Sequence, residues 1–282
     1  MTQVSIKLPY FDFLLTELAD GNPDVETAFG RHVHWGYWEN PQTADGTVQD
    51  FAQATEALSR LIVDGADIQS GMKVLDAGCG FGGTIASMNE RFSSMELVGI
   101  NIDSRQLQRA RATILPENNN TIEFVQGNAC QLPFADNSFD AVLAVECIFH
   151  FPSREEFFRE AARVLKPGGK LALSDFVVPE KKLSWQSNFP GLTMAIVGLL
   201  YGKVSNCTMN DYTSIAQQAQ LQSCWEKDIT AETIPTYDIL SSLMKSEGIK
   251  GVISTLINRA LASAQDSRSL LYKVLSYQKA DG

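Results

Sequence analysis

The segment from Val74 to Gly83, VLDAGCGFGG, contains the residue types that a ligand-binding turn requires. Glycine is needed where a ligand approaches the backbone closely or where the chain adopts dihedral angles that other residues avoid. Gly78, Gly80 and Gly83 match G-x-G-x-x-G, a pattern typical of dinucleotide-binding turns. A nicotinamide-dependent oxidoreductase is therefore one hypothesis, and a glycine-rich turn that binds nothing is another.

Asp76 favours a cationic ligand over a dinucleotide. It ends the apolar run before the glycines, where a carboxylate would repel a pyrophosphate and attract a positive charge. S-adenosyl-methionine carries a sulfonium and an ammonium group and no phosphate. In addition, no Tyr-x-x-x-Lys pair, a second signature of nicotinamide chemistry, follows the loop. The loop therefore favours S-adenosyl-methionine as the ligand.

A candidate general base, His150, follows a later apolar run in the segment ECIFHF. A hydroxyl that accepts a methyl group must lose its proton near neutral pH, and histidine is suited to take it. Asp175 ends the next run and could orient the imidazole, as a carboxylate does in hydrolytic triads. Alternatively, His150 packs in its loop and Asp175 caps a terminus. Cys147 is disfavoured as a nucleophile, because no basic residue stands beside it.

Five apolar runs recur from Gly71 onward: MKVLDAG, MELVGINI, TIEFVQG, FDAVLAVE and KLALSDFVV. Continuous apolar runs are typical of strands buried on both faces, and intervening helices are typical of a parallel sheet built from βαβ units. Two further strands are expected around residues 221–229 and 269–278. The pattern predicts an α/β protein with a Rossmann-like, doubly wound, seven-stranded, mostly parallel sheet, N-terminal helices and an inserted lid.

Local signals mark the helix before the fifth strand. Ser153 and Glu156 fit a capping box that opens it. Lys166-Pro167-Gly168-Gly169 predicts its end and the start of the strand that follows.

The same pattern divides the chain into four parts. We expect an N-terminal helical cap over residues 1–70 and the S-adenosyl-methionine-binding core over residues 71–179. The alternation of strands and helices stops over residues 180–218, where we expect a lid. Residues 219–282 are expected to complete the core sheet. The lid is rich in apolar and aromatic residues, which predicts an apolar or amphipathic acceptor. These residues could equally pack the lid onto the sheet or form the contact of a homodimer.

Composition limits the partners. The net charge of −10 disfavours binding to nucleic acid or to an anionic membrane. Five cysteines without C-x-x-C spacing predict reduced thiols and no metal site.

The first residues do not resemble a signal peptide, and the longest apolar stretch, residues 191–201, is too short to span a bilayer. We expect a cytoplasmic protein that acts on a small molecule.

Three segments in order resemble the class I S-adenosyl-methionine-dependent methyltransferases: VLDAGCGFGG, GNACQLPFADNSFD and RVLKPGGKLALSDF. The resemblance covers about residues 30–180. It is closest to small-molecule enzymes of the natural-product sugar and tocopherol type, to which HWGYW and ECIFHFPSR are also similar. It implies S-adenosyl-L-methionine as the cofactor and a small molecule as the methyl acceptor.

The resemblance also implies where the methionine part of the cofactor lies. Asp76, Gly78 and Gly80 match the loop around it. Trp35 and Tyr37 match an aromatic lip over the same end. His32 and His34 are adjacent to that lip, and we expect them to be structural or part of it.

At the ribose the chain departs from the family pattern. Many relatives have an acidic residue where this chain has Asn101. The resemblance therefore implies cofactor contacts from Asn101, Ile102 and Gln106, with the ribose held by Asn101 and Gln106. Asp103 could replace them only if the strand register slipped.

At the adenine, Asn128 replaces the usual aspartate. Its amide oxygen can still accept a hydrogen bond from the adenine amino group, and Ala129 offers its backbone N–H. Glu146 is available as a contact to the amino group of the cofactor.

The sequence thus predicts a small-molecule O-methyltransferase. In the sugar O-methyltransferases that it resembles, the residues matching His150 and Asp175 are the implied base and its helper. N- or C-methylation is the nearest alternative, because neither motif specifies the acceptor atom. A nucleic-acid methyltransferase is disfavoured by charge and by the lack of an N/D-P-P-Y/F motif after the fourth strand. An oxidoreductase and a non-catalytic cofactor-binding module are more remote alternatives.

Overall fold

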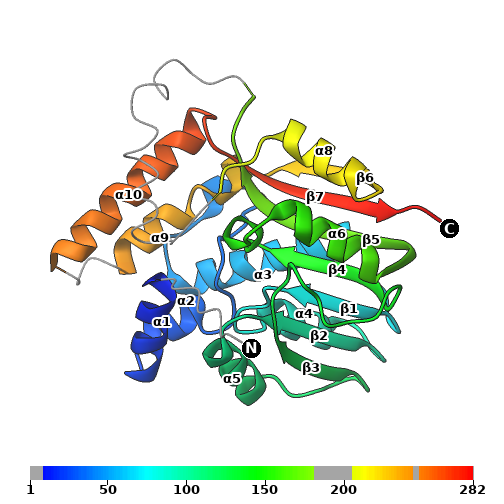
Figure 1. The fold of residues 1–282 in the computed structure, drawn as a ribbon. Helices are drawn as coiled ribbons and strands as arrows, with labels where there is room; N and C mark the ends of the chain where they lie inside the picture. Colours follow the sequence, from blue (N-terminus) through cyan, green and yellow to red (C-terminus); the bar gives the residue numbers. More distant parts are fainter. Residues whose placement is uncertain (1–8, 181–204, 244–247, 282) are drawn as a thin grey trace.

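A single sheet of seven strands forms the centre of the protein (Figure 1). We describe it from a computed structural model that covers residues 9–180, 205–243 and 248–281. The strand order is β3-β2-β1-β4-β5-β7-β6. The strands are β1 (Lys73–Ala77), β2 (Glu96–Asn101), β3 (Thr121–Gln126), β4 (Phe139–Val145), β5 (Leu165–Val177), β6 (Leu221–Asp228) and β7 (Leu271–Lys279).

Neighbouring strands among β1 to β5 run parallel, whereas β7 runs antiparallel to β5 and to β6. All five apolar runs form strands, and so do the two segments expected near the C-terminus. The predicted Rossmann-like, mostly parallel sheet is therefore confirmed. The strand order reverses between β1 and β4, and a ligand crevice is expected outside the carboxyl ends of the strands at such a switch point.

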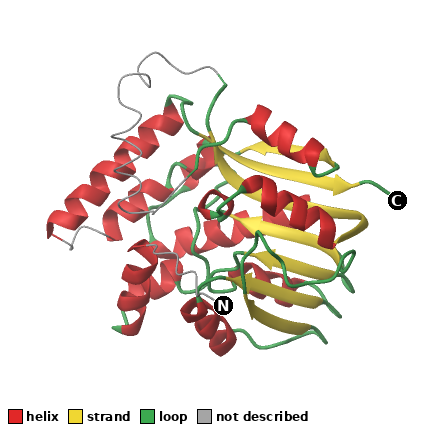
Figure 2. Cartoon of the chain, in the orientation of Figure 1, coloured by secondary structure: helices red, strands yellow, loops and turns green. Residues whose placement is uncertain are grey.

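Helices cover both faces of the sheet (Figure 2). One face carries α3 (Val48–Gly65), α4 (Gly83–Arg91) and α5 (Ser104–Thr113), and the other carries α6 (Arg154–Val164) and α8 (Met209–Gln218). Successive side chains of β1 belong to the apolar clusters on opposite faces of the sheet. Val74 packs with Leu58 of α3, and Leu75 belongs to the cluster around Phe157 of α6. Burial on both faces explains why the strands have continuous apolar runs.

A group of helices lies beyond the carboxyl ends of the parallel strands (Figure 1). It contains α1 (Pro9–Ala19), α2 (Pro23–Phe29), α9 (Thr236–Leu243) and α10 (Gly248–Asp266). Phe29, Phe51 and Ile239 share one apolar cluster there. The C-terminal part of the chain therefore helps to build the core of the N-terminal helices, which the sequence did not predict. No described helix has the length and apolarity needed to cross a membrane.

The division of the chain into four parts stays a prediction. Residues 181–204, which form most of the predicted lid, lie outside the described residues. This range includes the apolar positions Met194 and Leu200. The last part of residues 180–218 forms α8, which packs against α6 and β6 at the sheet.

Ser153 caps α6, because its Oγ atom accepts a hydrogen bond of 3.0 Å from the backbone N–H of Glu156. The predicted turn at Lys166–Gly169, however, lies inside β5 and not before it. The pairing of β4 with β5 shifts from Phe139–Leu165 to Ala141–Lys170, so this segment bulges out of an existing strand. Gly168 has a φ of +74°, which glycine adopts without strain.

Candidate active site

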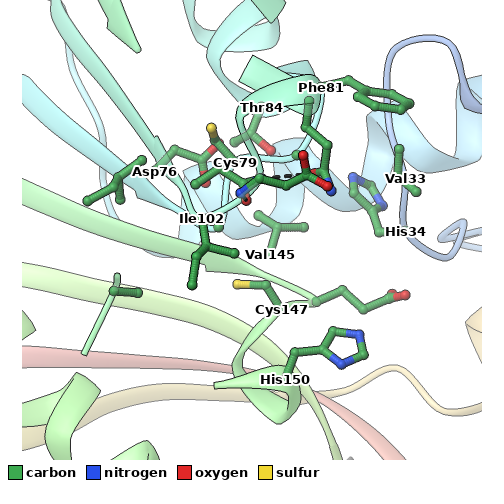
Figure 3. Close-up of a pocket in the computed structure, with 18 of the residues that line it drawn as sticks. Val33, His34, Asp76, Cys79, Phe81, Thr84, Ile102, Val145, Cys147 and His150 are labelled. Atoms are coloured by element: carbon green, nitrogen blue, oxygen red, sulfur yellow. Dashed lines mark hydrogen bonds between the residues drawn. The ribbon is translucent and has the colours of Figure 1, made fainter. Parts of the chain in front are cut away.

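A cavity opens at the carboxyl ends of β1, β2 and β4, at the point where the strand order reverses (Figure 3). About 980 Å³ of space lies between its walls, the open mouth and the solvent in it included. In Figure 3, Asp76 and Cys79 lie on one side of the cavity and Cys147 and His150 on the other. Nine of the eleven residues predicted to bind the cofactor are among its lining: Asp76, Gly78, Gly80, Asn101, Ile102, Gln106, Asn128, Ala129 and Glu146.

The glycine loop brings the backbone close to two neighbouring strands. Gly78 has a φ of +77°, and its N–H donates to the carbonyl of Ile100 in β2 at 2.8 Å. A Cβ atom at Gly78 would lie only 2.8 Å from Cys147, which follows β4. Gly80 also has a positive φ of +56°, but a Cβ atom there would meet only the Gln106 side chain, at 4.0 Å. Gly78 is thus required by the fold, whereas Gly80 leaves space open to the cavity.

Asp76 supplies a negative charge that the described part of the chain does not neutralise. Its side chain is buried, and its Oδ2 atom has no hydrogen-bond partner among the described residues. Burial raises the pKa of this carboxyl to about 7. A buried carboxylate is costly unless it is paired. A cationic ligand in the cavity would provide the missing partner, and the ammonium and sulfonium of S-adenosyl-methionine fit this requirement.

Polar side chains suited to a ribose stand at the end of β2. Asn101 Nδ2 donates to Gln106 Oε1 at 2.9 Å, and Asn101 Oδ1 accepts from the N–H of Asp103 at 3.1 Å. The carboxylate of Asp103 also borders the cavity but is paired with Arg105 at 2.7 Å. The register places Asn101 at the end of the strand, opposite Gln126, so the slip that would favour Asp103 does not occur.

The predicted adenine site follows β3. Asn128 Oδ1 already accepts a hydrogen bond of 2.9 Å from the N–H of Cys130. A carbonyl oxygen has two lone pairs, so one acceptor position remains for a ligand. Ala129 lies beside it in the lining of the cavity.

His150 ends a short 3-10 helix, η2 (Ile148–His150), directly after β4. It lines the same cavity as Asp76, and its Nε2 atom lies 3.3 Å from the hydroxyl oxygen of Tyr10 in α1. Further aromatic side chains line the cavity. Phe151 follows His150 in the chain, while Phe11 and Phe81 contact each other edge to face with centroids 5.9 Å apart.

Asp175 is not the partner of His150 in this structure. It is fully buried, and its Oδ2 atom accepts from Arg154 Nη2 at 2.7 Å and from the Tyr212 hydroxyl. Arg154 also donates to the carbonyl of Ser205 at 3.0 Å. Burial raises the pKa of Asp175, and Arg154 opposes that rise. The predicted helper of the base is therefore part of a buried ion pair that joins β5, α6 and the start of the segment leading to α8.

Comparisons with known proteins agree with this geometry. Residues 75–173 match the family model described as a methyltransferase domain. The chain is 31% identical over 254 residues to methyltransferase GfsG of Streptomyces halstedii, covering 85% of this chain and 87% of that protein. It is 28% identical to the 27-O-demethylrifamycin SV methyltransferase of Amycolatopsis mediterranei, covering 76% and 75% of the two chains. The chain belongs to the class I S-adenosyl-methionine-dependent methyltransferases.

A solved structure shows the same fold over nearly the whole chain. The mycolic acid cyclopropane synthase CmaA1, complexed with SAH and CTAB, superimposes with a TM-score of 0.77 and 17% identity, covering 97% of this chain and 99% of that one. This methyltransferase is of the secondary-metabolite type, and its cofactor is S-adenosyl-methionine.

Glu146 links the cavity of the methyltransferase to two distant segments. Its Oε2 atom accepts from the backbone N–H of Trp35 at 2.9 Å and from the hydroxyl of Tyr272 in β7. Its backbone has a φ of +48°, unusual for a residue with a side chain, and its N–H donates to Ser174 Oγ at 3.0 Å. Burial raises the pKa of this carboxyl to about 8. Its contact to the cofactor amino group stays a prediction.

The two aromatic residues predicted as a lip lie elsewhere. Neither Trp35 nor Tyr37 is among the described residues that line the cavity. The Trp35 ring packs edge to face on Phe176 and on Tyr237, with centroids 5.5 and 5.9 Å away. The Tyr37 hydroxyl accepts from Lys227 at 2.7 Å. These rings therefore contact β5, α9 and β6, elements that come late in the chain.

His32 and His34 line the cavity, whereas the aromatic lip was expected from Trp35 and Tyr37. Both are buried and line the cavity, and they form one hydrogen-bonded group, with His32 Nε2 2.9 Å from Glu56 and His34 Nε2 3.1 Å from Ser59 Oγ. Burial lowers the pKa of His34 to about 3. These histidines are thus both structural and part of the cavity wall.

The sequence missed three aromatic side chains of the cavity. Tyr10, Phe11 and Phe81 line it, although the N-terminal residues were predicted only as a helical cap. Phe81 stands inside the glycine loop at a variable position of the motif. The dipeptide Tyr10-Phe11 is compatible with any buried helix face, so only the docking of α1 reveals its place.

Gly80→Val should abolish binding of S-adenosyl-homocysteine, because a branched side chain at positive φ would fill the space next to Gln106. Isothermal titration calorimetry would measure this. The matched control is Gly71→Val, which has a similar φ of +88° and open space around it but lies outside the cavity lining. Gly71→Val should lose stability and keep binding. Equal affinity in the Gly80→Val protein and the wild type would contradict the placement of the site.

Binding of S-adenosyl-homocysteine, which retains the ammonium group, should tighten as the pH rises from 6 to 8. Below a pKa of about 7 the Asp76 carboxyl is protonated, and it must release that proton to pair with a cation. Asp76→Asn should weaken binding by about 10- to 100-fold, the usual value of a hydrogen bond to a charged group, and flatten this rise. A pH dependence unchanged in Asp76→Asn would assign it to another group, such as Glu146.

Arg154→Met should lower the free energy of unfolding by about 3–5 kcal/mol, because it leaves the buried Asp175 without its partner. Thermal and urea denaturation would measure the loss. Lys73→Met is the control, since its ion pair with Glu96 is exposed and such pairs contribute about 0–1 kcal/mol. A loss as small as that of the control would show that the Arg154–Asp175 pair does not hold these elements together.

Proposed function

We propose that this methyltransferase transfers its methyl group to a hydroxyl of a small secondary metabolite, with His150 as the general base. The observation that supports this proposal is that His150 and Asp76 lie on opposite sides of one cavity at the switch point of the sheet (Figure 3). The side that holds Asp76 suits the cationic cofactor, and the side that holds His150 suits the acceptor.

The residues of the chain supply binding, orientation and a proton acceptor. When bound, S-adenosyl-methionine provides an electrophilic methyl group on its sulfonium. Asp76 neutralises the positive charge of the ligand, and Gln106 and Asn128 hold its polar groups. The aromatic side chains hold the acceptor and exclude water, and positioning of this kind accounts for much of the rate in displacement reactions. His150 takes the hydroxyl proton, since histidine can be neutral near pH 7.

The cavity also supports a class of acceptor. Tyr10 contacts His150, and Phe11, Phe81 and Phe151 also line the cavity, so we propose an apolar or amphipathic acceptor. The name of the rifamycin relative places its methyl group on an oxygen, which favours O-methylation here. N- or C-methylation remains the alternative if no base is needed.

His150→Ala should reduce turnover by about 10²- to 10⁴-fold, the usual cost of removing a general base, while binding S-adenosyl-homocysteine normally. The wild-type rate should rise with pH, because only the neutral imidazole can accept the proton. A methylation assay over a panel of hydroxylated metabolites would test both points. If His150→Ala keeps more than a third of wild-type turnover with chemistry rate-limiting, His150 is not the base, and N- or C-methylation becomes the better proposal.

A further inference from the structure

The two nitrogens of the His150 ring differ in their access to the cavity. The Nδ1 atom is buried. The Nε2 atom lies 3.3 Å from the hydroxyl oxygen of Tyr10, and the two rings stack with centroids 6.0 Å apart and planes inclined by 23°. An acceptor in the cavity can therefore approach only Nε2, and the Tyr10 hydroxyl already occupies that position.

We propose that Tyr10 is a further catalytic residue, which relays the proton of the acceptor hydroxyl to His150. The inference rests on the proposed role of His150 as the base. Tyr10 itself lines the cavity and is half-buried, and its hydroxyl contacts the imidazole, so the residue stands between an acceptor in the cavity and the base. A tyrosine hydroxyl can donate and accept a hydrogen bond at once, as a relay requires.

The proton balance of the step is simple. The relay requires the neutral tautomer in which Nε2 accepts the Tyr10 hydrogen bond and Nδ1 carries the ring proton. The acceptor oxygen gains the methyl group, whose bond to the sulfonium sulfur of the cofactor breaks to leave a neutral thioether, and it gives its proton to the Tyr10 oxygen. At the same time the original hydroxyl proton of Tyr10 passes to Nε2. Tyr10 ends neutral, and His150 ends as the imidazolium.

Contacts of α1 with the core hold Tyr10 over the cavity. The next residue, Phe11, packs edge to face on Phe81 of the glycine loop. Asp12, which follows Phe11 in the chain, forms an ion pair of 2.8 Å with Arg105 of α5. The helix is thus attached both to the loop that faces the cofactor side and to the helix after β2. These contacts bring the first described helix of the chain to a base that follows the fourth strand.

A double-mutant cycle of Tyr10→Phe and His150→Ala would test the relay. Phenylalanine keeps the stacked ring and removes only the hydroxyl. We expect Tyr10→Phe to lose about 10²-fold in turnover, with the affinity for S-adenosyl-homocysteine unchanged within a few-fold. Because the two residues act in one step, the double variant should be no slower than His150→Ala. Tyr277→Phe is the control: it removes a hydroxyl from a tyrosine of β7 that is buried against Phe158, and it should keep wild-type turnover.

A readout independent of activity is available, because the chain has only three histidines. In ¹⁵N-histidine spectra of the protein without acceptor, the Nε2 resonance of His150 should move in Tyr10→Phe and stay in place in Tyr277→Phe. The relay is overturned if Tyr10→Phe keeps more than a third of turnover while His150→Ala does not, or if the losses multiply in the double variant. Full turnover in His150→Ala would instead overturn the proposed base itself.

Discussion

The burial of a carboxylate at the end of β1 is the constraint on which the site depends. Asp76 is held in the sheet by its strand register and cannot turn to solvent. Within the described part of the chain no cation neutralises it, and burial raises its pKa to about 7. Such a group is unfavourable for the folded protein alone, and it becomes favourable when a cationic ligand binds. The glycines beside it keep the backbone close enough for that ligand to reach it.

Two other buried carboxylates lie near the cavity, and they have different roles because their surroundings differ. Asp175 is neutralised by Arg154 and joins elements of the fold. Among the described residues, Glu146 accepts hydrogen bonds from neutral donors, the Trp35 N–H and the Tyr272 hydroxyl, and burial raises its pKa to about 8. The carboxylate of Asp175 thus stabilises the fold through an ion pair, whereas the carboxyl of Glu146 can change its protonation state with ligand or pH.

The wall of the cavity opposite the sheet comes from distant parts of the chain. Tyr10 and Phe11 lie on α1, and His32 and His34 follow α2. Their support includes Ile239 of α9, which shares an apolar cluster with Phe29 and Phe51. This wall of the cavity therefore depends on packing among helices, whereas the wall that contains Asp76 depends on strand ends.

The sequence alone determined the sheet, its seven strands and the cofactor loop. These depend on local patterns: apolar runs imply burial on both faces, and the glycines with Asp76 lie on consecutive residues, so their proximity needs no knowledge of the rest of the chain. The same locality placed Asn101 at the end of β2, Gln106 in the first turn of the helix that follows, and Asn128 just after β3, all at one edge of the sheet. Only the tertiary structure decided the partners of side chains from different elements. Asp175 binds Arg154, Trp35 packs on β5 and α9, and Tyr10 meets His150 across 140 positions of sequence. Such pairings follow from the way helices pack on the sheet, and residue spacing carries no record of that packing.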